Sequence, residues 1–287
     1  VSGSLGIIIP PSIPYIMYCN ASGASISELF LAGFLPGVLI ALCLMVYSYI
    51  YCKIHGEDKD KLNAKCMELR AKGLGTVLKE GFWALMSPVI ILGGIYGGIC
   101  SPTEAATISI FYSLIVSLFI YRTIKIRDLP KIMLEGIHSY APILIILSAA
   151  VAFARVITLM NVATIVSEAV LSAISSKVVI LLLINVLLLF VGMIMDTGPA
   201  ILVFTPVLLP VAEAIGVDPI HFGIIMCVNL AIGFVTPPMG ANLFVASNLS
   251  KVSVFDIARK AVPFILAFLI ALLLITFVPQ ISMFLLQ

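Results

Sequence analysis

The sequence predicts an all-α integral membrane protein with inverted repeats, broken helices and a re-entrant helical hairpin. Hydrophobic residues make up 62% of the 287 residues and charged residues only 10%, whereas soluble domains carry about 45–50% apolar and about 25% charged residues. The mean hydropathy is +1.21. These values argue against a water-soluble enzyme, a nucleic-acid-binding protein and a disordered scaffold, and they favour a chain embedded in a lipid bilayer.

Five apolar stretches are long enough to cross a membrane without interruption, since one crossing takes about 20 residues. These predicted transmembrane helices cover 29–52, 82–99, 103–121, 139–159 and 261–286. Two mixed apolar and polar segments, 125–138 and 160–177, are expected to lie in the plane of the interface.

Four other apolar stretches are unusual. Residues 3–19 and 219–248 are long enough to cross, but glycine and a Pro-Pro pair interrupt each at its centre. Residues 179–195 and 200–215 are too short to span comfortably, and the tight segment 196–199 joins them. We therefore expect two broken helices and one hairpin that enters and leaves the membrane on the same side.

These elements predict a division of the chain into five parts. They are a first broken helix, a scaffold helix with a basic loop, further scaffold helices with interfacial segments, a hairpin with the second broken helix, and a C-terminal transmembrane helix: 1–24, 25–80, 81–178, 179–250 and 251–287. The first and fourth parts are expected to form a transport domain.

Basic residues predict the orientation, because short cytoplasmic loops hold an excess of lysine and arginine. Threading the predicted elements through a bilayer puts three basic segments on one face, and these hold fourteen of the sixteen basic residues. The segments are 53–80, 122–131 and 251–260. We expect this face to be cytoplasmic, with 53–80 a solvated loop rather than a nucleic-acid-binding patch.

An internal repeat relates the two broken helices. A shift of 227 residues aligns them without a gap and matches Val1 with Val228, Gly6 with Gly233, Pro10 with Pro237, Pro11 with Pro238 and Pro36 with Pro263. Four full crossings and one re-entrant excursion separate the copies, so the second copy should be inverted. The same symmetry predicts a partner for the hairpin before residue 1, in a longer polypeptide.

The chemistry of such breaks favours ion binding. Proline removes a backbone donor and frees carbonyl groups at the end of the first half-helix, where the helix dipole is negative. The second half-helix, beginning near Ser12 or Met239, presents free N–H groups that suit an anion. The simpler alternative is that the breaks are packing kinks.

The turn of the hairpin carries one acid. Asp196 is the only acidic residue in 179–212, and a carboxylate at membrane depth is costly and usually functional. The alternative is that Asp196 only caps the second hairpin helix, and both roles can hold together. Glu104 is different, because Ser101-Pro102-Thr103-Glu104 has the pattern of a capping box.

Five segments resemble the large membrane (M) subunit of tripartite ATP-independent periplasmic (TRAP) transporters of the sialic acid or C4-dicarboxylate type. They are GIIIPPSIPYIMY, LFLAGFLPG, PVIILGGIYGGICSPTEAA, LLLINVLLLFVGMIMD and DPIHFGIIMCVNLAIGFVTPPMGANLFV. The resemblance covers nearly all of the chain, and the N-terminal portion of the family's proteins has no counterpart in it. It implies an ion-transporter-like, elevator-type importer in the bacterial inner membrane that couples sodium ions to uptake of a small organic acid. It also implies two partners, a small membrane (Q) subunit and a periplasmic substrate-binding protein.

The resemblance further implies which residues bind ions and substrate. Sodium ligands would come from Gly6, Ile9 and Pro11 at the first break, and from Gly233, Thr236 and Pro238 at the second. Ser12, Asp196, Thr197 and Asn242 would face the substrate. The first hairpin of the family is missing from this chain, so residues 1–287 alone are not expected to transport.

Three rival classes remain to be distinguished. A stand-alone sodium/divalent-anion symporter of similar architecture would need no binding protein. A channel would need a continuous pore, and an intramembrane enzyme would need a partner for Asp196 that the sequence does not offer. We expect a transporter, not an enzyme, with no nucleic-acid partner.

Overall fold

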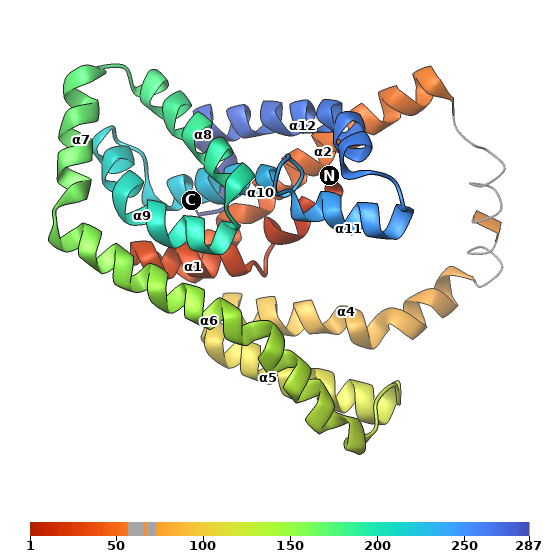
Figure 1. The fold of residues 1–287 in the computed structure, drawn as a ribbon. Coiled ribbons are helices and arrows are strands. Elements are labelled where there is room, and N and C mark those ends of the chain that lie inside the picture. The colour runs from red at the N-terminus through yellow and green to blue at the C-terminus, as the bar shows by residue number, and fades with distance from the viewer. Residues whose placement is uncertain (57–65, 68–72, 287) are drawn as a thin grey trace. The chain divides into compact units, whose positions relative to one another are not determined.

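The computed structural model describes residues 1–56, 66–67 and 73–286, and all regular secondary structure in these ranges is helical (Figure 1). Much of the basic loop predicted at 53–80 lies outside the described residues. The chain forms two compact units. We call 1–47 together with 141–287 the first unit, and 48–140 the second unit.

The described residues contain seven helices that are long and apolar enough to cross a membrane. They cover Ile26–Ile54, Gly75–Tyr96, Pro102–Ile120, Ile126–Leu159, Lys177–Ile194, Thr197–Ala214 and Val254–Phe277. The prediction of an all-α integral membrane protein is therefore confirmed.

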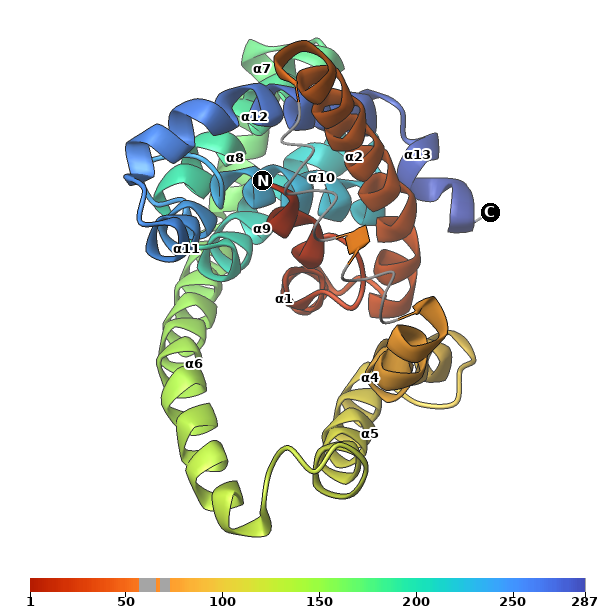
Figure 2. The same ribbon diagram turned by 90° about the vertical axis from the view of Figure 1, so that its right-hand side faces the viewer.

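The second unit contains a helix pair. Helix α4 (Leu74–Tyr96) packs beside α5 (Pro102–Ile115), which continues as a π-helix over Val116–Ile120 (Figure 2). The Tyr112 hydroxyl donates to the Trp83 carbonyl at 2.7 Å and ties the two helices together. The predicted capping box is present, since the Glu104 carboxylate accepts from the Ser101 backbone N–H at 2.7 Å.

Two long helices belong to both units, and one of them differs from the prediction. Helix α2 covers Ile26–His55, and α6 covers Leu129–Leu159. Because α6 is continuous, residues 129–138 are the start of a long helix rather than a separate interfacial segment. Helix α7 (Val162–Ala173) is separate and packs along α9.

A helical pair joined by a tight turn lies in the first unit where the hairpin was predicted at 179–215. Both helices are long and apolar enough to cross a membrane, so the prediction that these segments are too short to span is wrong. Their entry and exit on the same side of the membrane stay a prediction. Helix α8 (Lys177–Ile194) and helix α9 (Thr197–Ala214) are joined only by Met195 and Asp196. The next helix, α10, covers Pro219–Gly233, and Asp218 caps it by accepting from the Ile220 backbone N–H at 2.8 Å.

Helix α10 lies at the centre of the first unit. Every residue from Ile220 to Gly233 is buried, and the helix contacts α1 (Ile13–Ser22), α8, α9 and α12 (Val254–Phe277) (Figures 1 and 2). A helix that is apolar on all sides is expected to be enclosed in this way. The Tyr18 hydroxyl donates to the Pro219 carbonyl at 2.6 Å, which fixes α1 against the start of α10.

The two repeat copies share their order of elements. Each Pro-Pro pair is a cis peptide and is followed by a ten-residue helix, α1 in the first copy and α11 (Ala241–Ser250) in the second. Next comes a long helix with an internal proline, Pro36 in α2 and Pro263 in α12. In the first copy a short 3-10 helix, Ser2–Ile7, precedes the break. The inverted orientation of the copies stays a prediction.

The C-terminal helix is shorter than the predicted span 261–286. Helix α12 ends at Phe277, and the short helices α13 (Gln280–Met283) and Phe284–Leu286 follow. Pro279 accounts for the end, because a proline lacks the N–H and disfavours helical geometry in the residue before it.

Candidate functional site

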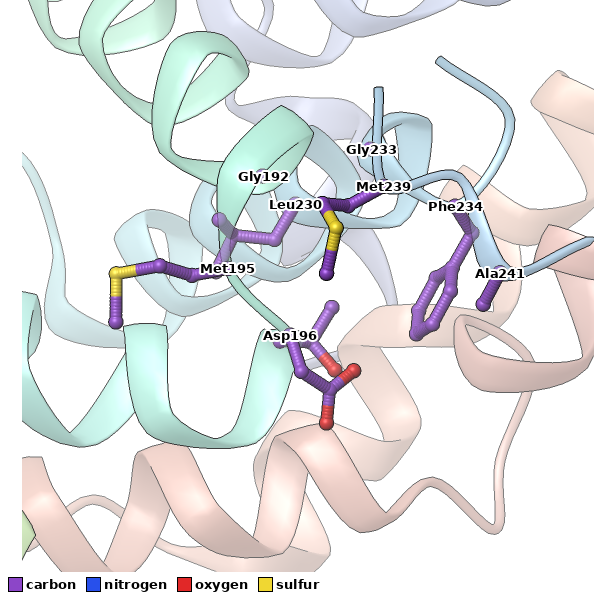
Figure 3. A pocket seen from close by; sticks show the side chains of 9 residues that line it. Gly192, Met195, Asp196, Leu230, Gly233, Phe234, Met239 and Ala241 are labelled. Atoms are coloured by element: carbon purple, nitrogen blue, oxygen red, sulfur yellow. The ribbon is translucent and has the colours of Figure 1, made fainter. Parts of the chain in front are cut away.

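A cavity of about 250 Å³ lies where the hairpin turn meets the second break (Figure 3). Four helix ends form its walls: the end of α8, the start of α9, the end of α10 and the start of α11. The lining residues are Gly192, Met195, Asp196, Thr197, Leu230, Gly233, Phe234, Met239 and Ala241.

The four helix ends give the cavity both electrostatic signs. The carbonyl ends of α8 and α10 are partially negative, and the N–H ends of α9 and α11 are partially positive. Neither α9 nor α11 has a hydrogen-bonded side-chain cap. The cavity can therefore attract a cation at one pair of ends and an anion at the other.

Asp196 does not cap α9 with its side chain. It occupies the N-cap position of α9, but its side chain makes no capping hydrogen bond. The carboxylate is exposed, whereas Thr197 beside it is only 7% exposed. Figure 3 shows Met239 extending from the second break toward this turn. The structural alternative raised by the sequence, a purely capping aspartate, has no hydrogen bond to support it.

Close backbone packing joins the hairpin to the second break. The Met239 backbone N–H donates to the Met193 carbonyl at 3.2 Å. A Cβ on Gly233 would collide with the carbonyl group of Gly192, and a Cβ on Gly192 would lie 3.3 Å from the Leu230 backbone. Two glycines therefore allow α8 and α10 to approach closely behind the cavity.

The second break uses some of its polar groups internally and leaves others available. Thr236 donates its N–H to the Gly233 carbonyl at 3.2 Å and its hydroxyl to the Ile232 carbonyl at 2.7 Å. No hydrogen bond from the described residues reaches the carbonyl oxygens of Thr236 or Pro238. These two oxygens fit the carbonyl ligands that sodium takes at broken helices.

The first break shows the same pattern. No group within the described ranges donates to the carbonyl oxygens of Gly6, Ile9 or Pro11. Ser12 lies apart from the cavity and is 2% exposed. Its hydroxyl donates to the Ile7 carbonyl at 2.5 Å and caps α1 by accepting from the Tyr15 N–H at 3.5 Å.

Asn242 connects the two repeat copies. Its side-chain amide donates to the Ser4 hydroxyl at 3.3 Å, and Ser4 is 1% exposed. Its backbone N–H donates to the Phe234 carbonyl at 3.0 Å. Asn242 thus lies beside the second break and contacts the helix that leads into the first break.

The structure brings some of the predicted residues into one cavity and leaves the others around it. Asp196, Thr197 and Gly233 line the cavity. The predicted residues outside the lining are Gly6, Ile9, Pro11, Ser12, Thr236, Pro238 and Asn242. The sequence prediction missed the apolar lining, such as Phe234 and Met239, because apolar side chains near a Pro-Pro pair carry no chemical signature of their own.

Comparison with known proteins identifies the family. The family described as "Tripartite ATP-independent periplasmic transporter, DctM component" matches residues 1–281. An isethionate TRAP transporter permease protein from Oleidesulfovibrio alaskensis is 44% identical over 99% of this chain and 44% of its own length.

Two further relatives carry the names of different substrates. A C4-dicarboxylate TRAP transporter large permease protein from Pseudomonas aeruginosa is 38% identical over 98% of this chain and 65% of its own. A sialic acid TRAP transporter large permease protein from Vibrio cholerae is 34% identical over 98% of this chain and 64% of its own length. The chain spans less than two thirds of the length of these relatives.

These relatives are transporter permeases rather than enzymes. Together with the seven apolar helices, they identify a multi-pass protein of the bacterial inner membrane. The chain belongs to the tripartite ATP-independent periplasmic transporter family, as a DctM component.

Proposed function

We propose that this chain is part of an importer that couples sodium entry to uptake of a small organic acid. The observation that carries the proposal is the cavity framed by two helix carbonyl ends and two uncapped helix N–H ends. In a membrane, this arrangement suits a cation and an anion bound side by side.

Sodium is proposed to bind at both breaks. At the second break, the carbonyl oxygens of Thr236 and Pro238 have no hydrogen-bond donor among the described residues. The same holds for Gly6, Ile9 and Pro11 at the first break. Oxygens without donors in a low-dielectric region gain from a cation. Gly233 contributes the close approach of α8 and α10 as well as the negative end of α10.

The substrate is proposed to bind through its acid group near the start of α9 and α11. Asp196 and Thr197 line the cavity and are proposed to face the substrate there. Asn242 beside the second break and Ser12 at the first break lie outside this lining, and they are proposed to contact the substrate in the complete protein. The three relatives described above carry the names of isethionate, C4-dicarboxylates and sialic acid, and each of these is a small organic anion. Phe234 and Met239 add an apolar wall that suits the carbon skeleton of such a molecule.

The Asp196 carboxylate supplies a physical reason for coupling. The carboxylate attracts sodium and repels an organic anion, and a bound sodium ion attracts that anion and offsets the repulsion. By linkage, the anion strengthens sodium binding by the same factor, and such couplings amount to about 1–3 kcal/mol. The anion is therefore expected to load efficiently only after sodium has bound.

An elevator motion is proposed to carry the loaded cavity across the membrane. The bond from Met239 to Met193 and the contact of Gly233 with Gly192 support movement of the hairpin and the second break as one body. The tripartite, periplasmic character in the family description supports two proposed partners, a small membrane (Q) subunit and a periplasmic substrate-binding protein.

Uptake into proteoliposomes tests this proposal. The complete membrane complex would be reconstituted and supplied with radiolabelled sialic acid, succinate or isethionate, with and without an inward sodium gradient and the cognate binding protein. We expect uptake of one of these acids only when both are present. Sodium-driven uptake without the binding protein would indicate a stand-alone symporter, and rapid uptake independent of both would indicate a channel.

A further inference from the structure

A buried polar chain links the helices behind the cavity. The Asn229 side-chain amide on α10 donates to the Asn185 side-chain oxygen at 2.7 Å and to the Asn185 carbonyl at 3.1 Å, on α8. The Asn185 amide donates to the Thr276 hydroxyl on α12 at 3.1 Å. The exposed fractions are 0% for Asn229, 3% for Asn185 and 1% for Thr276.

The asparagine pair lies on the same helix faces as the glycine contact. Asn185 precedes Gly192 by seven residues, which is about two turns of α8, and Asn229 precedes Gly233 by four residues, about one turn of α10. The end of this interface forms one wall of the cavity, since Gly192 and Gly233 both line it.

The glycine contact and the asparagine pair affect the packing of α8 and α10 in different ways. Glycines allow two helices to approach closely, but a smooth contact surface does not resist sliding along the helix axes. A slide would separate the buried amide of Asn229 from both of its acceptors, and unpaired buried amides are costly. The asparagine pair therefore opposes sliding in a way that the apolar and glycine contacts do not.

Stability alone does not account for the pair. The side-chain oxygen of Asn229 is buried and has no hydrogen-bond partner among the described residues. Two leucines of similar size would avoid that penalty, and replacing both members of a buried polar pair by apolar groups can be neutral or stabilising. The pair carries a cost that a purely structural contact would not need.

We infer that Asn185 and Asn229 are positioning residues that hold α8 and α10 in the register that shapes the cavity. They act on the bound ions through the positions of the hairpin turn and the second break, without touching the ligand. This role in sodium binding rests on the function proposed above, whereas the positioning of the cavity wall does not.

The test compares a double variant with a matched control in the complete transporter complex. Asn185→Leu/Asn229→Leu removes the pair without leaving a partner unpaired. Thr276→Val is the control, because it removes the bond to α12 and keeps the pair between α8 and α10. It leaves the Asn185 amide without this acceptor, so its unfolding midpoint should fall while the register of α8 and α10 is kept. Thermal unfolding in detergent should give the double variant a midpoint at or above that of the wild type.

The positioning is measured by cross-linking, which needs no sodium. In a background without the six native cysteines, Met195→Cys and Met239→Cys would be treated with thiol cross-linkers of several lengths. We expect one length to react fastest in the wild-type and Thr276→Val backgrounds, and we expect the double variant to lose that selectivity. Wild-type selectivity in a folded double variant would overturn the inference.

The consequence for ion binding is measured separately. Sodium concentration would be varied while following uptake and sodium-dependent thermal stabilisation. We expect the sodium midpoint of the double variant to rise about tenfold or more, as for other residues that position ion ligands, with Thr276→Val near the wild type. An unchanged midpoint would refute the link to sodium. Lack of any sodium response in the wild type would refute the proposed coupling and leave the cross-linking result to decide the positioning role.

Discussion

Single residues at the helix ends decide how the cavity is built. Asp196 lies at an N-cap position without making the capping hydrogen bond, and its residue is exposed at the cavity. Gly233 meets a constraint that its repeat equivalent does not, because a Cβ on Gly233 would strike Gly192, whereas a Cβ on Gly6 would have no atom within 4 Å. Equivalent positions in the two copies therefore differ in what they tolerate.

Asp196→Ala is expected to abolish uptake while leaving the protein folded. The side chain makes no capping bond and is exposed, so the change in unfolding free energy should stay within about 0.5 kcal/mol. Proteoliposome uptake and thermal unfolding of the complete complex measure the two effects.

Glu104→Ala supplies the control for Asp196, because that carboxylate is engaged in a capping box. It should lower the thermal unfolding midpoint slightly, through loss of the capping box, and retain uptake. Wild-type uptake in the Asp196→Ala protein would contradict the proposed role of its carboxylate.

Gly233→Ala and Gly6→Ala form a second matched pair. The added methyl at Gly233 meets the backbone carbonyl group of Gly192 across the helix contact, so overpacking should cost about 1–3 kcal/mol. The methyl at Gly6 meets nothing within 4 Å and should leave the unfolding midpoint near the wild type. Equal midpoints for the two variants would show that α8 and α10 do not pack as described.

Helices in this chain begin and end where proline and the caps require. The hairpin was predictable because Asp196-Thr197-Gly198-Pro199 interrupts two apolar runs, and proline favours the first turn of a helix. The broken helices were predictable from the two Pro-Pro pairs. The continuity of α6 was not, because the polar residues of 125–138 suggest an interfacial helix while their backbone continues directly into the apolar run.

Parts of the site were also beyond sequence reasoning. Asp196 is visible as a lone acid in an apolar stretch, but nothing local to Gly192 or Leu230 says that they face the second break. Ser12 is visible beside a proline pair, but its bond to the Ile7 carbonyl depends on how the chain turns at the break. Contacts between segments distant along the chain set these features.

Ser12→Ala is expected to weaken the start of α1. Loss of the cap and of the bond to Ile7 should lower the unfolding free energy by about 1 kcal/mol. The kinetics of uptake then separate a capping role from substrate contact. If the Ser12 hydroxyl also contacts the substrate, its loss in Ser12→Ala should raise KM. Ser253→Ala, which removes the cap of α12, is the control and should leave KM unchanged.

At the scale of the whole molecule, the distribution of basic residues predicts the orientation in the membrane. Basic residues gather in three segments, and the positive-inside rule predicts that those segments face the cytoplasm. The turn between α4 and α5, which holds Cys100, should then face the periplasm. Cys66 lies within the basic segment 53–80 and is exposed.

Single-cysteine variants test this orientation. A membrane-impermeant maleimide should label Cys100 in right-side-out vesicles and Cys66 only in inverted vesicles. Cys227, which is buried in α10, serves as the control and should stay unlabelled in both until the protein is denatured. The reverse pattern for Cys66 and Cys100 would invert the predicted topology.

The backbone contact of Gly192 with Gly233 has a consequence for inhibitor design. Because the hairpin and the second break touch through backbone, a molecule cannot wedge them apart without breaking the bond from Met239 to Met193 as well. Competitive blockers should therefore enter from the exposed Asp196 side and fill the space against Phe234. The affinity of a compound should increase with how well it fills that space. A bulky group that points toward the glycine contact should lower the affinity.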